Sequence, residues 1–404
     1  MPPLSLGIGL GLSRSSAPPP VTLDLRSGSA FGFAVDTLVP AGCAYSRAAC
    51  VGSVQSGTST LYDYSAFGLS VANMLVWGRA LDAWDVGLLV EEARTNRVPD
   101  ASNFSAASWT LGGAVTRTGS QPGPTGTNSA NRLQAAGGSN FLYRNATGLS
   151  NVSHTGSLWL RPTTPPAALG ALLGGATTGL STALAATAWA RYDASVLPFG
   201  GTSITAFAVD ARDNYGFGAG ARDWLAYGVQ LETGAFPTEF VPTSGAAATR
   251  AASFLRSLAA THAPRIVTGR LSIELVLRAK GARTEYGGTT SLWYVDASNQ
   301  ASFVPSTGVL TITVAGSTNT VTLPSWARYD LIELFVAAGG GLATVVKYRL
   351  NGGSVTSLAV TGSALGTHAA GDLYLCSANA GQHLSCWLYT VRFYATGTAP
   401  GWAQ

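Results

Sequence analysis

The strongest constraint on the fold is a two-residue alternation of side chains in the C-terminal third of the chain. Leu271, Ile273, Leu275 and Leu277 alternate there with Ser272, Glu274, Val276 and Arg278. Successive side chains of a strand point to opposite faces, so this period predicts a strand with one buried face. The same period recurs over 309–314 and 387–393, and VVKYRL meets Asn351-Gly352, a strong hairpin signal. Short strands of this kind, separated by turns, predict an antiparallel sandwich or jelly roll.

A pentapeptide repeat extends this prediction to the middle of the chain. Trp189-Ala-Arg-Tyr-Asp193 recurs as Trp326-Ala-Arg-Tyr-Asp330, and each copy lies between two strand-like segments. Coincidence is one explanation. We favour two sandwiches of the same kind, with each tryptophan packed in its own core. The fold class expected is therefore all-β, with two tandem antiparallel β-sandwich (jelly-roll) domains after an irregular N-terminal attachment region.

The length and the punctuation of the chain predict its division. A chain of 404 residues is long enough for two or three domains. Proline, serine and alanine clusters mark the expected boundaries. The expected parts are an apolar, proline-rich N-terminal anchor at 1–20, an attachment region at 21–100, a first β-sandwich at 101–250, a linker at 251–263 and a second β-sandwich at 264–404.

Composition excludes several classes of protein. Charged residues make up 11% of the chain and hydrophobic residues 46%, against about 25% charged residues in an average soluble protein. This hydrophobic share argues against disorder, and a surface built from Ser, Thr, Asn and Gly is typical of extracellular or virion β-structure. The net charge is +4 and the only lysines are Lys280 and Lys347. Without a basic patch, nucleic-acid binding is excluded.

Two apolar segments raise the question of a membrane. The N-terminal MPPLSLGIGLGLSRS lacks a basic region before its apolar stretch and contains Pro2 and Pro3, so it is a poor signal peptide. From Arg161 to Arg191 no charge interrupts the chain, but Gly, Thr and Pro do. We expect buried strands and loops in this segment, and no membrane insertion.

Four cysteines leave two interpretations open. Cys43 with Cys50 and Cys376 with Cys386 would form two local disulfides, or all four would remain reduced thiols in the core. Neither pair has the close spacing of a zinc motif, and His383 beside Cys386 is too little to complete one.

The usual catalytic motifs are missing from the sequence, so we expect that the protein is not an enzyme. It contains no HExxH, GxSxG, Walker-type or CxxC motif. Glu91 and Glu92 are paired carboxylates, as in glycosidases, but neighbours on a strand point to different faces. One enzymatic alternative stays open: a depolymerase that degrades capsular polysaccharide, with catalytic acids contributed by different strands or subunits.

A sugar-binding surface needs aromatic rings beside polar side chains. Six aromatic residues have such neighbours: Tyr215, Phe217, Trp224, Tyr286, Trp293 and Tyr294. Core packing is the alternative role for each of them. Asp210, Asp213 and Asn214 are oxygen donors that could hold a structural Ca²⁺, or form an ordinary solvated turn. No other cofactor or metal is expected.

Two stretches resemble a family of virion proteins. Gly87-Leu-Leu-Val-Glu-Glu-Ala-Arg-Thr-Asn96, followed by Asn103-Phe-Ser-Ala-Ala-Ser-Trp109, resembles the "GLLIEEARTN … NF…W" junction of many phage and prophage virion proteins. Downstream, the family's "GAQLE…TSYIPT…TR" ending is matched by Tyr227–Glu232, Phe236–Thr243 and Thr249-Arg250. Upstream, the family's "FTRAS" segment resembles Tyr45-Ser-Arg47. These matches bracket residues 45–250.

The resemblance implies a function and a location. Its members are tail fibres, tail-tip proteins or head spikes of tailed phages and gene transfer agents. It implies that the first sandwich, at 101–250, is a carbohydrate-binding-like jelly roll and that the second, at 264–404, is a concanavalin/laminin-G-like sandwich. We expect a structural virion surface protein that is assembled in the bacterial cytoplasm, attaches to other virion proteins through its N-terminal region, and adheres to host surface polysaccharide. Copies would form a homo-oligomer, a trimer or a pentamer. The alternative is a purely structural capsid-decoration or tail component without sugar binding.

The resembling junction also has a physical interpretation. Glu91, Glu92 and Arg94, with Asn96 close by, could form a buried ionic and hydrogen-bonded corner between the N-terminal region and the first sandwich. Glu232 would be a structural partner as well, with Arg250 as its expected counterion.

Overall fold

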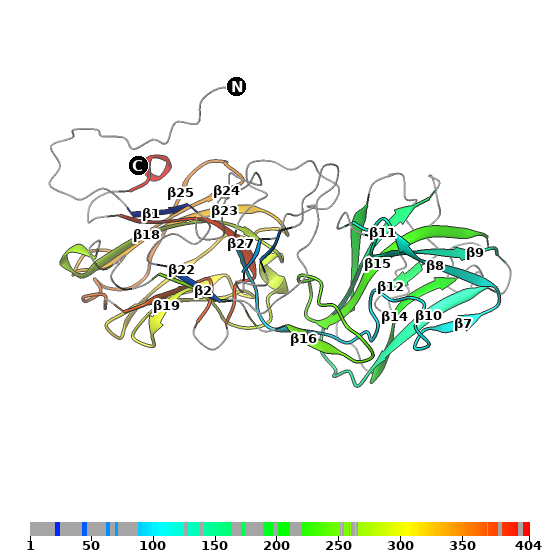
Figure 1. Ribbon diagram of the computed structural model, residues 1–404. Coiled ribbons are helices and arrows are strands. Elements are labelled where there is room, and N and C mark those ends of the chain that lie inside the picture. The colour runs from blue at the N-terminus through cyan, green and yellow to red at the C-terminus, as the bar shows by residue number, and fades with distance from the viewer. Residues whose placement is uncertain are drawn as a thin grey trace, which may run out of the picture.

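The computed structural model describes most of the chain from residue 88 to residue 404. Short gaps fall at 125–127, 138–139, 164–170, 174–188, 197–200, 211–219, 251, 253, 258, 260–262, 264–265, 370, 379–381 and 395–398. Of the first 87 residues it describes the backbone of four strands: β1 (Val21–Asp24), β2 (Cys43–Ser46), β3 (Tyr62–Tyr64) and β4 (Leu69–Val71). The expected anchor at 1–20 lies outside the described residues. The described chain folds into antiparallel strand ladders (Figure 1), which confirms the all-β class.

The first sandwich has two facing sheets. One contains, in spatial order, β13 (Ala190–Val196), β11 (His154–Pro162), β15 (Arg222–Thr233), β9 (Ala130–Ala135) and β8 (Val115–Gln121). The other contains β12 (Ala171–Leu173), β14 (Ser203–Asp210), β10 (Phe141–Thr147) and β7 (Thr110–Gly112). Its core includes the rings of Phe104, Trp109 and Phe207, whose centroids lie 4.7 to 6.1 Å apart. Aromatic packing of this kind fills the space between the sheets.

The second sandwich is larger. Its first sheet contains β1, β27 (Cys386–Tyr394), β18 (Arg270–Ala279), β23 (Leu331–Gly339), β24 (Val345–Leu350) and β25 (Thr356–Leu358), and β5 (Leu88–Val90) also pairs with β27. The opposite sheet contains β2, β17 (Phe254–Ser257), β26 (Leu373–Leu375), β19 (Thr290–Asp296), β20 (Asn299–Val304), β21 (Val309–Val314) and β22 (Ser317–Thr322).

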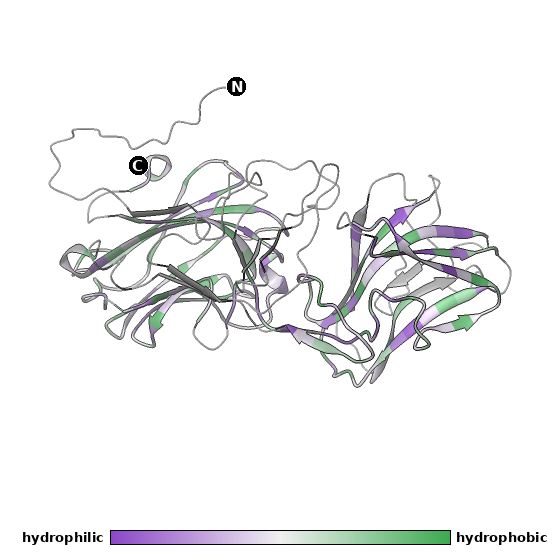
Figure 2. Ribbon diagram, viewed as in Figure 1, coloured by the Kyte–Doolittle hydropathy of each residue, from purple (hydrophilic) through white to green (hydrophobic). Residues whose placement is uncertain are grey.

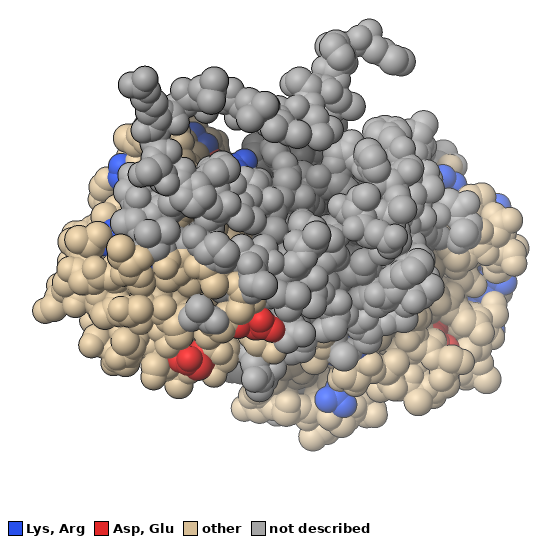
Figure 3. All heavy atoms as spheres, turned by 60° about the vertical axis from the view of Figure 1, so that its left-hand side comes forward, with Lys and Arg blue, Asp and Glu red and all other residues tan. Residues whose placement is uncertain are grey.

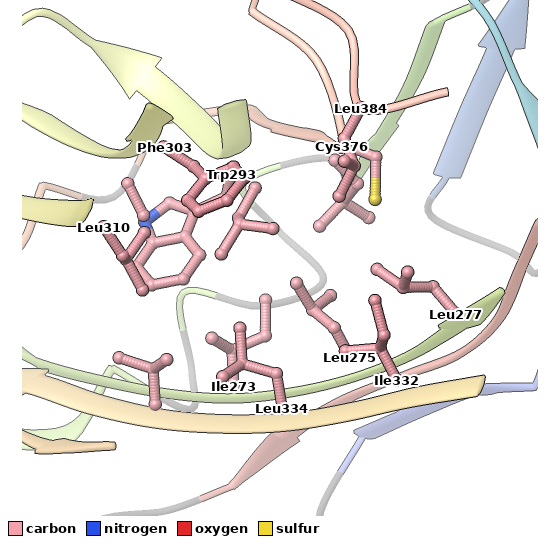
Figure 4. Packing of buried hydrophobic residues seen from close by; sticks show 14 of the residues in the cluster. Ile273, Leu275, Leu277, Trp293, Phe303, Leu310, Ile332, Leu334, Cys376 and Leu384 are labelled. Atoms are coloured by element: carbon pink, nitrogen blue, oxygen red, sulfur yellow. The ribbon is translucent and has the colours of Figure 1, made fainter. Parts of the chain in front are cut away.

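The alternation along β18 is confirmed in the core of this sandwich. Ile273, Leu275 and Leu277 point inward and pack against side chains of the opposite sheet such as Trp293 and Phe303 (Figure 4). The outward-facing residues of β18 are buried as well, because β18 lies between β27 and β23 and its outer face is also covered. Figure 2 shows how polar and apolar residues mix along the strands of both sandwiches.

Strands from outside the expected domain complete the second sandwich. β5 pairs with β27 through Leu88↔Leu388 and Val90↔Cys386, and β1 pairs with the same strand. β2 pairs with β17, which in turn pairs with β26. The expected attachment region thus contributes the edge strands β1, β2 and β5 to the sheets of the 264–404 part, and the expected linker contributes β17, which lies between β2 and β26. The first sandwich is inserted between strands of the second.

A short ladder connects the two sandwiches. β6 (Arg94–Asn96) enters the first sandwich, β16 (Ala248–Arg250) leaves it, and the two strands pair side by side (Figure 1). The entry and exit of the inserted sandwich are therefore fastened together at one place.

Both tryptophans of the repeat and the Asn351-Gly352 turn lie as the sequence predicts. Trp189 is 8% exposed in the first core and Trp326 is 6% exposed in the second, which confirms that each repeat anchors its own core. Asn351 and Gly352 follow β24 as a turn with φ of 50° and 70°, the left-handed values that a tight hairpin turn requires. In the described part of the chain, no helix is long and apolar enough to span a membrane.

Candidate functional site

The most unusual feature of the molecule is a buried cluster of four charges at the junction of the sandwiches. The Glu91 carboxylate contacts Arg250, with Nη2 2.9 Å from Oε2, and also contacts the Lys280 ammonium. The Lys280 Nζ lies 3.7 Å from Oε1 of Glu239. Side chains in these pairs are at most 3% exposed. Two acids and two bases sum to zero charge, which is the condition under which ionised groups tolerate removal from water.

The members of this cluster come from three parts of the chain. Glu91 follows β5, a strand of the second sandwich, and Arg250 ends β16 of the connecting ladder. Lys280 directly follows β18, at the end of the second sandwich nearest the ladder. Glu239 belongs to the loop after β15, and its backbone N–H donates to Glu91 Oε1 over 3.1 Å. The cluster therefore fixes the first sandwich, the ladder and the second sandwich to one another.

A second polar link joins the sandwiches beside the cluster. Arg328 of the second sandwich donates to both carboxylate oxygens of Glu285, each over 2.7 Å, and to Oδ2 of Asp193 in the first sandwich over 2.5 Å. It also donates to the Ala235 carbonyl over 2.5 Å. Burial alone would lower the pKa of Arg328, but the hydrogen bonds and charges of Glu285 and Asp193 outweigh it and raise the pKa. The guanidinium stays charged and holds the two domains together.

This link connects the two copies of the repeat. Asp193 ends the first copy and Arg328 lies in the second. The corresponding Arg191 stays within the first sandwich, where it donates to Ser157 Oγ over 2.9 Å and to the Thr238 carbonyl over 2.6 Å. The two copies of the repeat therefore place their tryptophans alike, each in its own core, whereas their arginines bind different partners.

The predicted ionic corner is correct in part. Glu92 pairs with Arg94, and Glu91 is buried whereas the Glu92 side chain is 39% exposed, so the two neighbours do face different ways. The expectation that Glu91 pairs with Arg94 is wrong, because Arg250 and Lys280 occupy its two oxygens.

Glu232 and Asn96 organise the loops around the ladder. Glu232 accepts hydrogen bonds from the Thr238 N–H, the Thr238 hydroxyl and the Gln230 amide over 2.6 to 2.7 Å. The arginine that pairs with Glu232 is Arg94, with Nε 3.9 Å from Oε2, whereas the expected partner Arg250 pairs with Glu91. The Asn96 amide donates to the carbonyls of Val229 and Val241 over 3.1 and 2.9 Å, and its oxygen accepts two backbone N–H groups. Its full set of partners explains a buried asparagine at this position.

A polar groove of about 310 Å³ opens beside the junction. Its lining includes Glu92, Arg94 and Arg97 from the ladder side, Thr233 from the first sandwich and Glu285 from the second. Both carboxylates already bind an arginine, which is typical of structural ion pairs. Among the described residues, no group of three or more His, Cys, Asp or Glu side chains could hold a metal ion.

The structure places most candidate sugar-binding rings in the cores. Trp224, Tyr286 and Trp293 are 0%, 6% and 1% exposed. Their rings offer no face to a sugar, so we withdraw them as sugar-binding candidates; core packing accounts for their placement. Tyr294 is half-buried, and Tyr215 and Phe217 lie outside the described residues.

Tyr286 has a structural role at the junction. Its ring packs on Phe236 of the first sandwich with centroids 5.0 Å apart, and its hydroxyl donates to the Ser385 carbonyl over 2.8 Å. Burial raises the pKa of this hydroxyl well above its usual value, so it stays a neutral donor at physiological pH.

Of the calcium candidates, Asp213 and Asn214 lie outside the described residues and Asp210 is placed only by its backbone in β14. Cys376 and Cys386 are buried free thiols, while the side chains of Cys43 and Cys50 are not described. Burial, together with a hydrogen bond that the Cys386 thiol donates to Cys376, raises the pKa of Cys386, as is typical of an unreactive core cysteine.

Comparisons with protein-family models and with curated proteins find no match for this chain. The residues that form the junction therefore carry the functional argument by themselves. Sequence reasoning missed Lys280, Glu239 and Arg328 as junction residues. One signal for Lys280 was available: it is one of only two lysines in the chain, placed at the end of a strand that is otherwise apolar on its inner face.

Proposed function

We propose that the chain is a non-catalytic surface protein of a phage-like particle that adheres to host cell-surface polysaccharide. The observation that carries this proposal is the neutral, buried cluster of Glu91, Arg250, Lys280 and Glu239. It lies where the sequence resembles the junction of virion proteins, and it fastens two sandwiches into one body. A protein that transmits force between a particle and a cell needs such a rigid connection.

The surface of the molecule is consistent with this role. On the face drawn in Figure 3, the described Lys, Arg, Asp and Glu side chains form separate spots among uncharged residues. Polysaccharides are bound through many weak hydrogen bonds and ring contacts, and several copies on one particle multiply their strength. A trimer or a pentamer at the virion surface, attached through the N-terminal region to other virion proteins, would supply these copies.

The described carboxylates favour binding over catalysis. Glu91, Glu92, Glu232 and Glu285 are each held by basic side chains or by several hydrogen-bond donors. A glycosidase needs one carboxyl group kept protonated as a general acid and a second placed across the bond that breaks. The junction offers charge-balanced pairs instead.

The test is binding to cells. The labelled, purified chain is incubated with capsulated host cells and with capsule-free mutants of the same strain. Saturable binding that disappears together with the capsule is the expected result. Equal binding to both, or no binding to either, would overturn the adhesion proposal.

A second candidate is a purely structural capsid-decoration or tail component. The burial of Trp224, Tyr286 and Trp293 favours it, because three of the rings predicted to meet sugar pack in the cores instead. Particles assembled without the protein distinguish the two roles. Normal assembly with lost adsorption supports adhesion, and defective or unstable particles support the structural role.

A further inference from the structure

The outer face of the first sheet of the second sandwich is unusually covered. Ser272 of β18, Ala337 of β23 and Val345 of β24 form one row across three strands, and Glu274, Phe335 and Lys347 form the next. These residues point away from the core, since their neighbours along each strand point into it. Such a face normally meets water and is polar, yet Phe335 and Ala337 are 3% and 5% exposed.

The last residues described cover one end of this face. The Trp402 indole N–H donates to Glu274 Oε1 over 2.7 Å, and the Tyr394 hydroxyl donates to Glu274 Oε2 over 2.6 Å. Arg392 neutralises the same carboxylate, with Nη1 2.9 Å from Oε2. Arg349 lies over the Trp402 ring, 5.1 Å from its centroid, and forms an ion pair with Glu333. The acids of this face are therefore already paired.

Beside the covered end lies a cavity of about 480 Å³. Phe335, Ala337, Leu342 and Val345 supply apolar walls, and Leu342 and Val345 are 48% and 37% exposed at its edge. Its volume falls in the range of about 300–1,000 Å³ that is typical of small-molecule sites. An apolar wall with an exposed edge suits the C–H face of a sugar ring.

One polar side chain of this cavity, that of Ser272, lacks the hydrogen-bond partner that a buried hydroxyl normally has. Ser272 is 2% exposed, lines the cavity, and its Oγ makes no hydrogen bond to any residue that the structure describes. Buried hydroxyls are nearly always hydrogen-bonded, so an orphaned one facing a cavity points to a missing polar partner.

Two cationic side chains, those of Arg270 and Lys347, line the same cavity. Arg270 donates to the carbonyls of Ala343, Ala337 and Gly339 over 2.9 to 3.4 Å, and Lys347 donates to the Ala403 carbonyl. No Asp or Glu belongs to the lining, and within the described residues neither cation forms an ion pair. Burial lowers the pKa of Arg270, which an added anion would reverse.

We propose that this cavity binds the carboxylate-bearing sugar unit of an acidic polysaccharide. The carboxylate meets the positive charge of Lys347 and Arg270, a ring hydroxyl satisfies Ser272 Oγ, and the apolar ring face packs on Val345 and its neighbours. This inference rests on the proposed adhesion function. It assigns hexuronic acids, rather than neutral sugars, as the units of the polysaccharide that the cavity binds.

The test uses the full chain and a hexuronic-acid oligosaccharide, with the neutral glucose oligosaccharide of the same length as the matched probe. Isothermal titration should detect the acidic probe, with little binding of the neutral one. Lys347→Gln should weaken binding at least about tenfold, because it removes a charge-assisted hydrogen bond. Ser272→Ala, which changes no charge and little volume, should weaken it about threefold to tenfold. Arg161→Gln lowers the net charge equally in the first sandwich and should leave affinity unchanged.

The outcomes separate this proposal from the adhesion function. Equal affinity for both probes, or affinity that neither Lys347→Gln nor Ser272→Ala reduces, would overturn the cavity as the site. If both variants still bind capsulated cells as the unaltered chain does, adhesion stands and the cavity is refuted. If the chain binds the acidic probe through Lys347 and Ser272 but ignores capsulated cells, the site stands and the adhesion function is refuted.

Discussion

Replacing Glu91 by glutamine tests the charge balance at the junction. The substitution keeps the shape of the side chain but leaves Glu239 as the one remaining acid of the four-residue cluster beside Arg250 and Lys280, a net charge of +1 among side chains that are at most 3% exposed. Removing one partner of a buried ion pair costs about 3–5 kcal/mol of unfolding free energy. With a urea m-value of about 2 kcal/mol/M, the unfolding midpoint should fall by about 2 M.

The neighbouring glutamate provides the matched control. Glu92→Gln removes the same charge one residue away, from a side chain that is 39% exposed and pairs with Arg94, and should cost about 0–1 kcal/mol. Adding Lys280→Met to Glu91→Gln restores neutrality and should recover part of the loss in a double-mutant cycle. Urea unfolding followed by tryptophan fluorescence measures the unaltered chain, the three single variants Glu91→Gln, Glu92→Gln and Lys280→Met, and the double variant. If Glu91→Gln costs no more than Glu92→Gln, the cluster does not hold the junction as argued.

Three further predictions concern the link between the sandwiches, a core ring and a buried histidine. Arg328→Met should cost about 2–3 kcal/mol in urea unfolding and speed proteolysis of the native chain, because Asp193 and Glu285 lose their shared cation; unchanged proteolysis would contradict the link. Trp293→Ala should lower the free energy of unfolding by about 3–5 kcal/mol, since the Trp293 ring is 1% exposed in the second core. A variant that keeps its stability and loses only sugar binding would show instead that the ring contacts the ligand. Burial lowers the pKa of His154 from its ordinary 6.5, so the unfolded chain binds the proton more readily than the folded one. Its contribution to stability is present above pH 6.5 and is lost as the pH falls through the lowered value. His154→Gln should therefore flatten the dependence of the urea midpoint on pH between about pH 7.5 and 5, and an unaltered slope would assign that dependence to other groups.

Periodicity predicted the second sandwich well. The alternation over β18 placed Ile273, Leu275 and Leu277 in the core, where the structure finds them. The Asn351-Gly352 turn was predicted for the same local reason, because two consecutive left-handed residues favour Asn and Gly. Signals of this kind predict the folded structure correctly because they depend only on neighbours along the chain.

The domain division and the pairing of charges could not be predicted in the same way. Strand β5 has no local signal that it will pair with β27, at the far end of the chain. Aromatic residues beside polar ones look alike whether their rings face solvent or core. Trp224 and Trp293 were candidates for sugar contact for that reason, although the inward face of their strands decides their role.

By itself, then, the sequence determined the all-β class, the inward face of the principal strands, the two tryptophan anchors and the structural character of the junction around Glu91. Only the tertiary structure decided that Glu91 meets Lys280, 189 residues away, and Arg250 rather than Arg94. It also decided that the first sandwich is inserted into the second, and that Ser272, Arg270 and Lys347 line one cavity. The reason is that the period of a strand fixes which face a side chain takes. Which distant charge or hydroxyl comes to share that face depends on how the sheets assemble.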